Sequence, residues 1–311
     1  MNELFHHGVK GMKWGVRRYQ NPDGTLTPEG RKRYRIDGPI GKKALSMNTD
    51  KDDKWKDERR RKWIRQMTGE EVESVTKIKK RESPDEKTEF KKGHTVSHIT
   101  TKDTNIKPEK GRVLFVAADE ADKKLYSSVL AASIHKHLGG VKIKQVEFKL
   151  KQDLTAPSKR EAIEIFKDQY KKHEKEYIDY FARTLSNFAK NPDFKDQFTK
   201  EERNPETFRK RFNENMKKQW LENDGYWLFN MGLTFQGNLS KKIYKGYLDE
   251  IKARGYNALV DDNDSRKSTM NGKVPLIILD ELAMLGDMKV KDITKESVLQ
   301  DYNDWVKTQK S

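Results

Sequence analysis

Short stretches with alternating or continuous hydrophobic positions predict the strands of this chain. Residues 94–100 (HTVSHIT) alternate, and residues 111–118 (GRVLFVAA) form a compact apolar run. Residues 256–260 (YNALV) and 274–280 (VPLIILD) read in the same way. Residues 141–150 (VKIKQVEFKL) alternate strictly, but polar and apolar side chains mix on both faces. We therefore expect this last strand to change its pairing partner midway.

Between these strands, hydrophobic positions recur at helical spacing. Residues 119–140 predict an amphipathic helix that a glycine ends. A second helix begins at Ser158, which stands in capping-box spacing with Glu161. Its apolar stripe consists of Ile163, Phe166, Tyr170, Tyr177, Phe181 and Leu185. Asn204 before Pro205 predicts the start of a further helix.

Two more amphipathic helices complete the pattern. Residues 240–255 place Ile243, Tyr247 and Ile251 on one stripe and end at a glycine, and residues 294–309 form the last helix. Strands on both sides of a helical block predict an α+β fold, with a small split antiparallel or mixed sheet and a large helical insertion. The expected division is a docking module at 1–40, a basic helical linker at 41–82, an α+β domain at 83–293 with its insertion at 156–239, and a C-terminal helix at 294–311.

Composition places the chain at the polar edge of the globular range. Of its 311 residues, 33% are hydrophobic and 37% are charged, and the mean hydropathy is −1.04. A substantial part of the chain is therefore expected to be extended or to face solvent. The sequence contains no cysteine, which excludes disulfides, thiolate zinc sites and cysteine nucleophiles.

The net charge of +16 is uneven along the chain. Residues 1–82 carry +9 and the remaining 229 residues carry +7. A basic leading segment is typical of a chain that meets nucleic acid or an acidic protein surface, so nucleic acid is an expected partner of residues 31–82. The stretch 54–66 (KWKDERRRKWIRQ) is equally typical of a solvated helix face, and both interpretations stay open.

Several kinds of site are absent from the sequence. No apolar run approaches the roughly 18 residues that span a bilayer, and the N-terminus lacks the apolar core of a secretory signal. We expect neither membrane insertion nor secretion by a signal peptide. The common phosphate-binding and nucleophile-elbow glycine motifs do not occur. The acidic stretch 261–272 begins like a calcium loop, but Arg266 and Gly272 occupy the positions that need glycine and glutamate, so no metal site is expected.

The segment 5–34 (FHHGVKGMKWGVRRYQNPDGTLTPEGRKRY) is too aromatic for a flexible tail and too basic for a core. Its Asn-Pro-Asp-Gly stretch predicts a turn, and Thr27 before Pro28 predicts the start of a short basic helix. Alone, such a segment buries too little apolar area to be stable. We expect it to be ordered only against another surface.

The order of elements resembles the small ADP-ribosyltransferase-like domains of phage and mobile-element polyvalent proteins. The resemblance covers about residues 90–155 and 240–290, and its most specific piece is KARGYNALVDDND followed by PLIILDEL. It implies that NAD binds in a cleft between two small sheets. His98 would bond the adenosine ribose and Tyr126 would stack on the nicotinamide. Asp262 or Asp280 (or Asp261) would stabilise the transition state as nicotinamide leaves.

The residues also support structural interpretations. A single strand histidine is commonly a hydrogen-bonded structural residue, Tyr126 suits helix packing, and the acidic cluster suits a solvated turn. The family has an aromatic residue before its histidine and a glutamate at the start of its last strand, where this chain has Ser97 and Lys273. The sequence therefore leaves open whether the domain is an NAD-dependent ADP-ribosyltransferase acting on a host protein or a degenerate, non-catalytic domain.

Residues 5–34 resemble a module found near the N-termini of proteins that phages and prophages of Gram-positive bacteria encode. The sharing of this leader by different C-terminal domains implies an address that docks to phage head or portal proteins. The chain is therefore expected to be a phage accessory protein in the virion or the host cytoplasm, as an enzyme or as a structural or morphogenesis protein.

Overall fold

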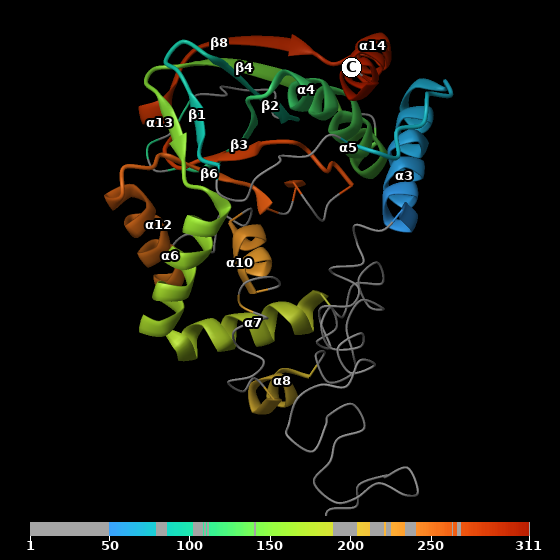
Figure 1. Cartoon of the computed structure of the whole chain (residues 1–311). Helices are drawn as coiled ribbons and strands as arrows, with labels where there is room; N and C mark the ends of the chain where they lie inside the picture. The colour runs from blue at the N-terminus through green and yellow to red at the C-terminus, as the bar shows by residue number, and fades with distance from the viewer. Residues whose placement is uncertain are drawn as a thin grey trace, which may run out of the picture.

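The computed structural model gives the chain a mixed α+β fold (Figure 1). The expected docking module, including residues 5–34, lies outside the described residues. The described residues are 50–78, 86–101, 108, 110, 112–139, 141–188, 204–211, 221, 225–233, 241–262, 264–265 and 269–310.

A six-stranded sheet organises the described part of the chain, in the order β6-β7-β3-β2-β4-β8. Its members are β2 (Thr95–Thr100), β3 (Leu114–Ala117), β4 (Lys144–Leu150), β6 (Ala258–Val260), β7 (Pro275–Ile278) and β8 (Leu285–Asp292). All neighbours pair antiparallel. A second sheet pairs β1 (Thr88–Phe90) with β5 (Leu154–Ala156). The histidine-bearing strand β2 and the last apolar strand β7 therefore share one sheet, with β3 between them.

The expectation that residues 141–150 change partner midway is wrong. Strand β4 is a central strand, paired with β2 along one edge and with β8 along the other. Its mixed faces have another cause: Val146 and Phe148 are buried on one face, while the buried Gln145 lies on the opposite face. Strand β8 has no counterpart among the expected strands, because its apolar alternation is limited to Met288 and Val290, and both side chains are exposed.

Successive side chains along each strand point to opposite sides and so define two faces of the six-stranded sheet. On the small-sheet face, Val96, Val116 and Ile278 pack in one cluster with Leu154 and Ala156 of β5. On the helical face, the neighbouring positions of the same strands meet two clusters of helices. Because side chains alternate along a strand, adjacent residues of β2 belong to different faces.

One cluster on the helical face, the α6–α12 cluster, lies over β6 and β7. Its helices are α6 (Lys159–Lys172), α7 (Glu174–Phe188), α8 (Pro205–Arg211), α10 (Tyr226–Gly232) and α12 (Lys242–Ala253). The Ser158 hydroxyl accepts from the Glu161 amide, as the capping spacing predicts. The stripe predicted from Ile163 to Leu185 is divided at His173, whose φ of −136° ends α6 before α7 begins. Gly255, with a φ of +85°, stops the chain after α12, as expected.

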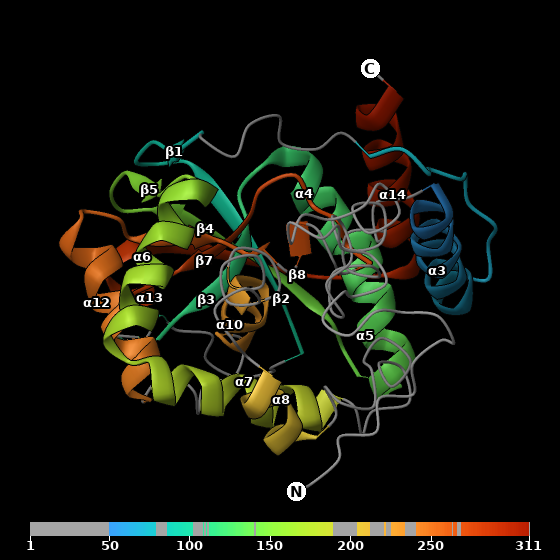
Figure 2. The ribbon, with the colours of Figure 1, turned by 60° about the horizontal axis from the view of Figure 1, so that its bottom comes forward.

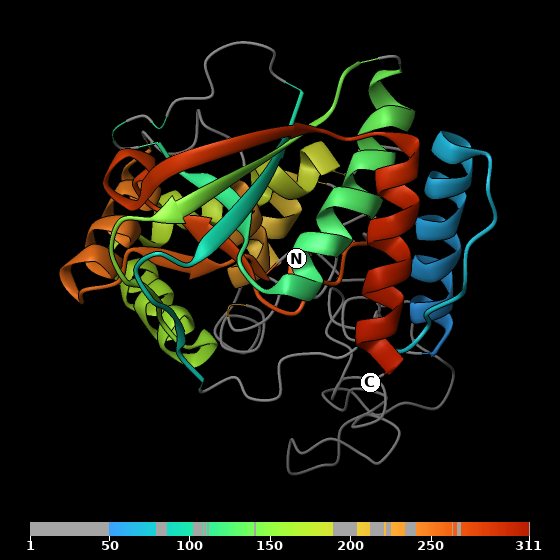
Figure 3. The ribbon, with the colours of Figure 1, turned by 90° about the horizontal axis from the view of Figure 1, so that it is seen from above.

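The other cluster, the α3–α14 cluster, lies beside it on the same face. Its elements are α3 (Asp50–Thr68), α4 (Glu120–Leu125), the π-helical turn η1 (Tyr126–Leu130), α5 (Ala131–Leu138) and α14 (Lys295–Lys310). Figures 2 and 3 show α5, α14 and α3 running side by side. The described chain thus carries two groups of helices on one side of the sheet.

Helix α3 is part of this body rather than a separate arm. Trp63, Ile64 and Met67 are buried in the α3–α14 cluster. The Arg60 guanidinium is also buried, and it donates to the carbonyl oxygens of Val75 (2.8 Å) and Thr269 (2.9 Å). The helix of the segment expected as a linker therefore packs on α5 and α14. None of the helices that the structure describes is both long and apolar enough to cross a membrane.

Candidate functional site

His98 lies on the small-sheet face of β2. It is paired across the strands with Val146, and adjacent positions of β2 belong to opposite faces. Its Nδ1 atom donates a 2.8 Å hydrogen bond to the carbonyl oxygen of Phe115 in the neighbouring strand β3. The ring is half-buried. Through this bond, one of its two nitrogens helps to join β2 to β3.

Tyr126 lies on the other side of the sheet, in the α3–α14 cluster with Ile99 and Ala117. It is the first residue of the π-helical turn η1, and its hydroxyl donates 2.7 Å to the carboxylate of Asp264. Burial, then the charges of nearby carboxylates, hold its pKa well above the ordinary value, so the hydroxyl stays a donor. The structure therefore joins Tyr126 to the acidic stretch after β6, but through Asp264 rather than through Asp261 or Asp262.

Asp262 is buried and faces the start of α6. Its carboxylate forms an ion pair with Lys159 at 2.9 Å, and its backbone amide donates to the side-chain oxygen of Asn230. Asn230 in turn donates to the Val260 carbonyl. These contacts tie the loop after β6 to α6 and α10.

Asp280 caps a short helix. Its carboxylate accepts from the Ala283 amide at the start of α13 (Glu281–Met284). It follows the carboxyl end of β7, whereas Asp261 donates from its amide to Pro275 at the opposite end of that strand. The two acids that were alternatives for the catalytic role, Asp262 and Asp280, therefore lie near opposite ends of β7.

The four expected site residues consequently do not converge. His98 and Tyr126 are separated by the sheet, and the two alternative acids lie at different ends of β7. The structure therefore places the two residues that the resemblance assigns to NAD, His98 and Tyr126, on opposite faces of the sheet.

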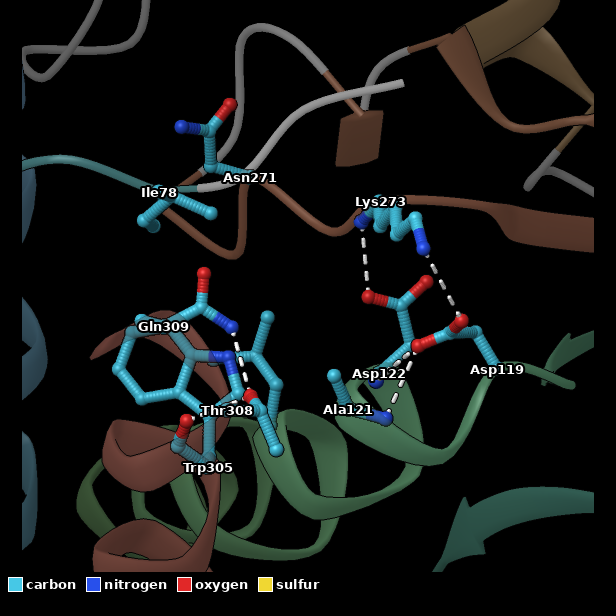
Figure 4. A pocket seen from close by; sticks show the side chains of 10 residues that line it. Ile78, Asp119, Ala121, Asp122, Asn271, Lys273, Trp305, Thr308 and Gln309 are labelled. Carbon is cyan, nitrogen blue, oxygen red and sulfur yellow. Dashed lines mark hydrogen bonds and ion pairs between the residues drawn. The ribbon is translucent and has the colours of Figure 1, made fainter. Parts of the chain in front are cut away.

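A different group of polar side chains meets at the start of α4 (Figure 4). Asp122 is only 1% exposed, and its two carboxylate oxygens accept from the amides of Lys273 and Val274, both at 2.7 Å. The Lys273 ammonium lies 3.6 Å from the carboxylate of Asp119, which caps α4. The lysine thus spans two carboxylates, one buried and one half-exposed.

These residues line a cavity of about 260 Å³. Its apolar wall consists of Ile78, Ala121, Leu125 and Trp305, and its polar wall consists of Asp119, Asp122, Asn271, Lys273, Thr308 and Gln309. The volume is below the range of typical cofactor pockets, which begins near 300 Å³. Such a cavity has room for water or a small solute, but not for a dinucleotide.

Asp122 has a strongly perturbed acidity. Removal from water raises its pKa to about 7, although the two backbone amides act in the opposite direction. A buried acid that titrates near neutrality beside a cavity is a candidate for proton transfer, but the same arrangement also serves structure. Here both oxygens are used to fix the turn before β7, so the geometry favours a structural latch. Among the described residues, no cluster of three or more His, Asp or Glu side chains could hold a metal ion.

The sequence contains a partial signal for this missed group. Asp122 stands three residues before Leu125 and seven before Val129, which places an acid on the buried stripe of an amphipathic helix. Nothing in the local sequence relates it to Lys273 or Val274, about 150 positions later.

Comparison with known proteins bears only on the N-terminus. The sequence model of a family of unknown function (DUF7211) matches residues 1–21. No curated protein and no solved structure matches the chain.

Proposed function

We propose that this chain is a phage-encoded accessory protein that docks through its N-terminal segment, and that its α+β domain is a non-catalytic body. The observation that carries the proposal is the separation of His98 from Tyr126 by the six-stranded sheet. ADP-ribosyl transfer would need both residues on one NAD molecule, and a ligand cannot reach through a hydrogen-bonded sheet.

The existing contacts of the four residues support the same conclusion. His98 bonds a backbone carbonyl, Asp262 pairs with Lys159, and Asp280 caps α13. Each interaction satisfies a polar group within the fold, as stability requires. In this proposal the scaffold has kept its shape and uses these side chains to hold it.

The leader supplies the address. A family match confined to residues 1–21 supports a module whose sequence is independent of the body behind it. Its basic and aromatic side chains suit docking into a groove of a partner, with Trp14 as an anchor. Phage head or portal proteins are the proposed partners, and the virion is the proposed location.

Incubation of the full chain with labelled NAD and host lysate tests the non-catalytic body. We expect no NAD consumption and no labelled product, with a known ADP-ribosyltransferase as the positive control. The variants His98→Ala and Tyr126→Phe should behave like the parent chain. Label transfer that His98→Ala abolishes would overturn the proposal.

Mass spectrometry of purified particles tests docking. We expect the full chain to be present, and Trp14→Ala to reduce its incorporation by several-fold. Leu282→Ala is the matched control, because Leu282 is a large apolar residue outside the leader with an exposed side chain. Absence of the chain from both virions and assembly intermediates, or full incorporation of the Trp14 variant, would contradict the address.

ADP-ribosyl transfer is the second candidate, favoured by one observation. The family that the chain resembles has a carboxylate at the start of its last strand. In this chain the buried carboxylate of Asp122 in α4 lies beside the corresponding residues, Lys273 and Val274. This candidate predicts label transfer that Asp122→Asn removes and that Asp119→Asn leaves intact. Equal transfer by both variants would exclude Asp122 as the acid.

A further inference from the structure

A surface groove between α3 and α5 carries an arrangement that the proposed function does not use. Its volume is about 370 Å³. The lining residues are Trp55, Glu58, Arg59, Lys62, Trp63, Lys136 and His137. From this groove we propose that the chain binds single-stranded nucleic acid, with an unstacked base on Trp55 and the phosphates on the lysines.

The aromatic part of the groove is pre-arranged. The Arg59 guanidinium carbon lies 5.0 Å from the ring centre of Trp55 and 5.1 Å from that of Trp63. The arginine is thus shared by two tryptophans two helical turns apart, and cation–π contacts of this kind restrict its motion. These three side chains form a row along α3. Trp63 is buried at one end of the row, and Trp55 is 48% exposed at the other end.

An exposed tryptophan of this size has an energetic reason to be covered. Its ring presents a large apolar surface to water next to cationic side chains. A nucleobase offers a flat surface to stack on it, and stacking of a base on an aromatic side chain is worth roughly 1–3 kcal/mol. In a duplex the bases stack on one another, so only single strands present a free base face.

The charges around the ring favour a polyanion. Lys62 lies one helical turn from Arg59 on α3, and Lys136 approaches from the last turn of α5. Glu58 is the one acid among the lining residues. The segment 1–49 that precedes α3 is itself basic, with ten lysines and arginines against four acids, so charge disfavours it as the occupant of this groove.

An acidic peptide is the competing occupant. It would satisfy the lysines, but carboxylate side chains would leave the Trp55 ring uncovered. The nucleic acid uses both the ring and the charges, and that is why we favour it. The two occupants differ in a measurable way, because only one of them depends on Trp55.

Fluorescence anisotropy of labelled dT10 and U10 with the full chain tests the proposal. Trp55→Ala should weaken binding by about 5- to 160-fold, the equivalent of one stacked base. Trp55→Phe should recover part of the affinity, because a smaller aromatic ring still stacks. The double variant Lys62→Ala, Lys136→Ala should lower the slope of log affinity against log salt by about 1.4, for two phosphates of a single strand.

The control variant is Lys245→Ala, which removes an exposed lysine of α12 in the α6–α12 cluster, outside the groove between α3 and α5. It should leave dT10 binding unchanged. Circular dichroism confirms that each variant is folded. No binding of dT10 or U10 at 50 mM salt would overturn the proposal, as would an affinity that Trp55→Ala does not alter. Binding of a polyglutamate peptide as tight as that of dT10, and independent of Trp55, would assign the groove to an acidic protein partner instead.

Discussion

The hydroxyl of Tyr126 donates a 2.7 Å hydrogen bond to the carboxylate of Asp264, 138 positions further along the chain. This bond joins the turn η1 to the acidic loop after β6. We expect Tyr126→Phe to lower the free energy of unfolding by about 2 kcal/mol, because a partly buried carboxylate loses its donor. Urea unfolding measures the change.

Tyr256→Phe is the matched control for this bond. The Tyr256 hydroxyl also donates to a carboxylate, at 2.6 Å, but its acceptor Glu161 is a quarter exposed and can turn to water. Its loss should cost clearly less than the loss at Tyr126. Equal costs for the two variants would show that the Tyr126–Asp264 bond contributes nothing special to the loop.

Asp122 should make stability depend on pH. Burial raises its pKa to about 7, whereas an exposed aspartate titrates near 3.9. Between these values the folded chain holds a proton that the unfolded chain has lost. This carboxyl therefore makes the free energy of unfolding fall as pH rises from about 4 to 7, by about 4 kcal/mol in all.

Asp122→Asn should remove that slope. At pH 5 the parent's Asp122 is protonated, and its hydroxyl oxygen can still accept from a backbone amide. The NH₂ group of asparagine cannot accept, so one of the amides of Lys273 and Val274 would lose its acceptor and the variant should be less stable than the parent. The difference should shrink between pH 5 and 8, as measured by urea unfolding at each pH. Asp119→Asn, which changes the half-exposed neighbour, should keep the parent's slope. A constant gap between Asp122→Asn and the parent would contradict the raised pKa.

Gly232 should tolerate no side chain. A Cβ atom there would collide with the hydroxyl groups of Tyr244 and Tyr180. Tyr244 cannot easily move, because it is fully buried and stacks on Phe229 with ring centres 4.3 Å apart. We expect Gly232→Ala to cost about 3 kcal/mol, measured by thermal and urea unfolding.

Gly246→Ala is the control for that clash. A Cβ atom at Gly246 meets the end of the Gln169 side chain at 2.9 Å, which can shift. The alanine also gains about 1 kcal/mol of helix propensity inside α12. Its net effect should be near zero, and a large loss at Gly246 together with none at Gly232 would contradict the packing of α10.

Arg112 and Glu281 form a two-point ion pair, with Nε to Oε1 and Nη2 to Oε2 both at 2.6 Å. Glu281 is 1% exposed, so Arg112→Met would remove a two-point ion pair from a buried carboxylate. We expect a loss of about 3 kcal/mol by urea unfolding. Asp249→Asn, which breaks the exposed pair with Lys245, should change little. Comparable losses in both variants would be inconsistent with the burial of Glu281.

The sequence predicted those helices and strands whose buried face produces a regular spacing of hydrophobic residues. The helix start at Ser158 and the end of α12 at Gly255 follow from local chemistry, and the structure confirms both. Strand β8 was missed, because it is an exposed edge strand whose apolar alternation is limited to Met288 and Val290. The burial of Arg60 was also not predicted. A run of charged residues is typical of a solvated helix face, yet Arg60 lies on the buried stripe of α3 at helical spacing from Ile64 and Met67.

The site was less predictable than the fold. His98 and Tyr126 were placed together by resemblance, whereas the alternation of β2 assigns His98 to one face and leaves Tyr126 on the other. Strand register decides such a relationship, and a one-residue difference reverses it. The contacts of Asp122 and Asp264 join segments about 140–150 positions apart, and one sequence alone contains no record of such pairings.

The anchoring of α3 has a mechanical consequence. The helix begins at Asp50, and Arg60 lies over the ring of Trp305 in α14, 5.6 Å from its centre. Tension applied through a bound leader would therefore act first on the contacts between α3 and α14, the first and last described helices, before it reached any strand.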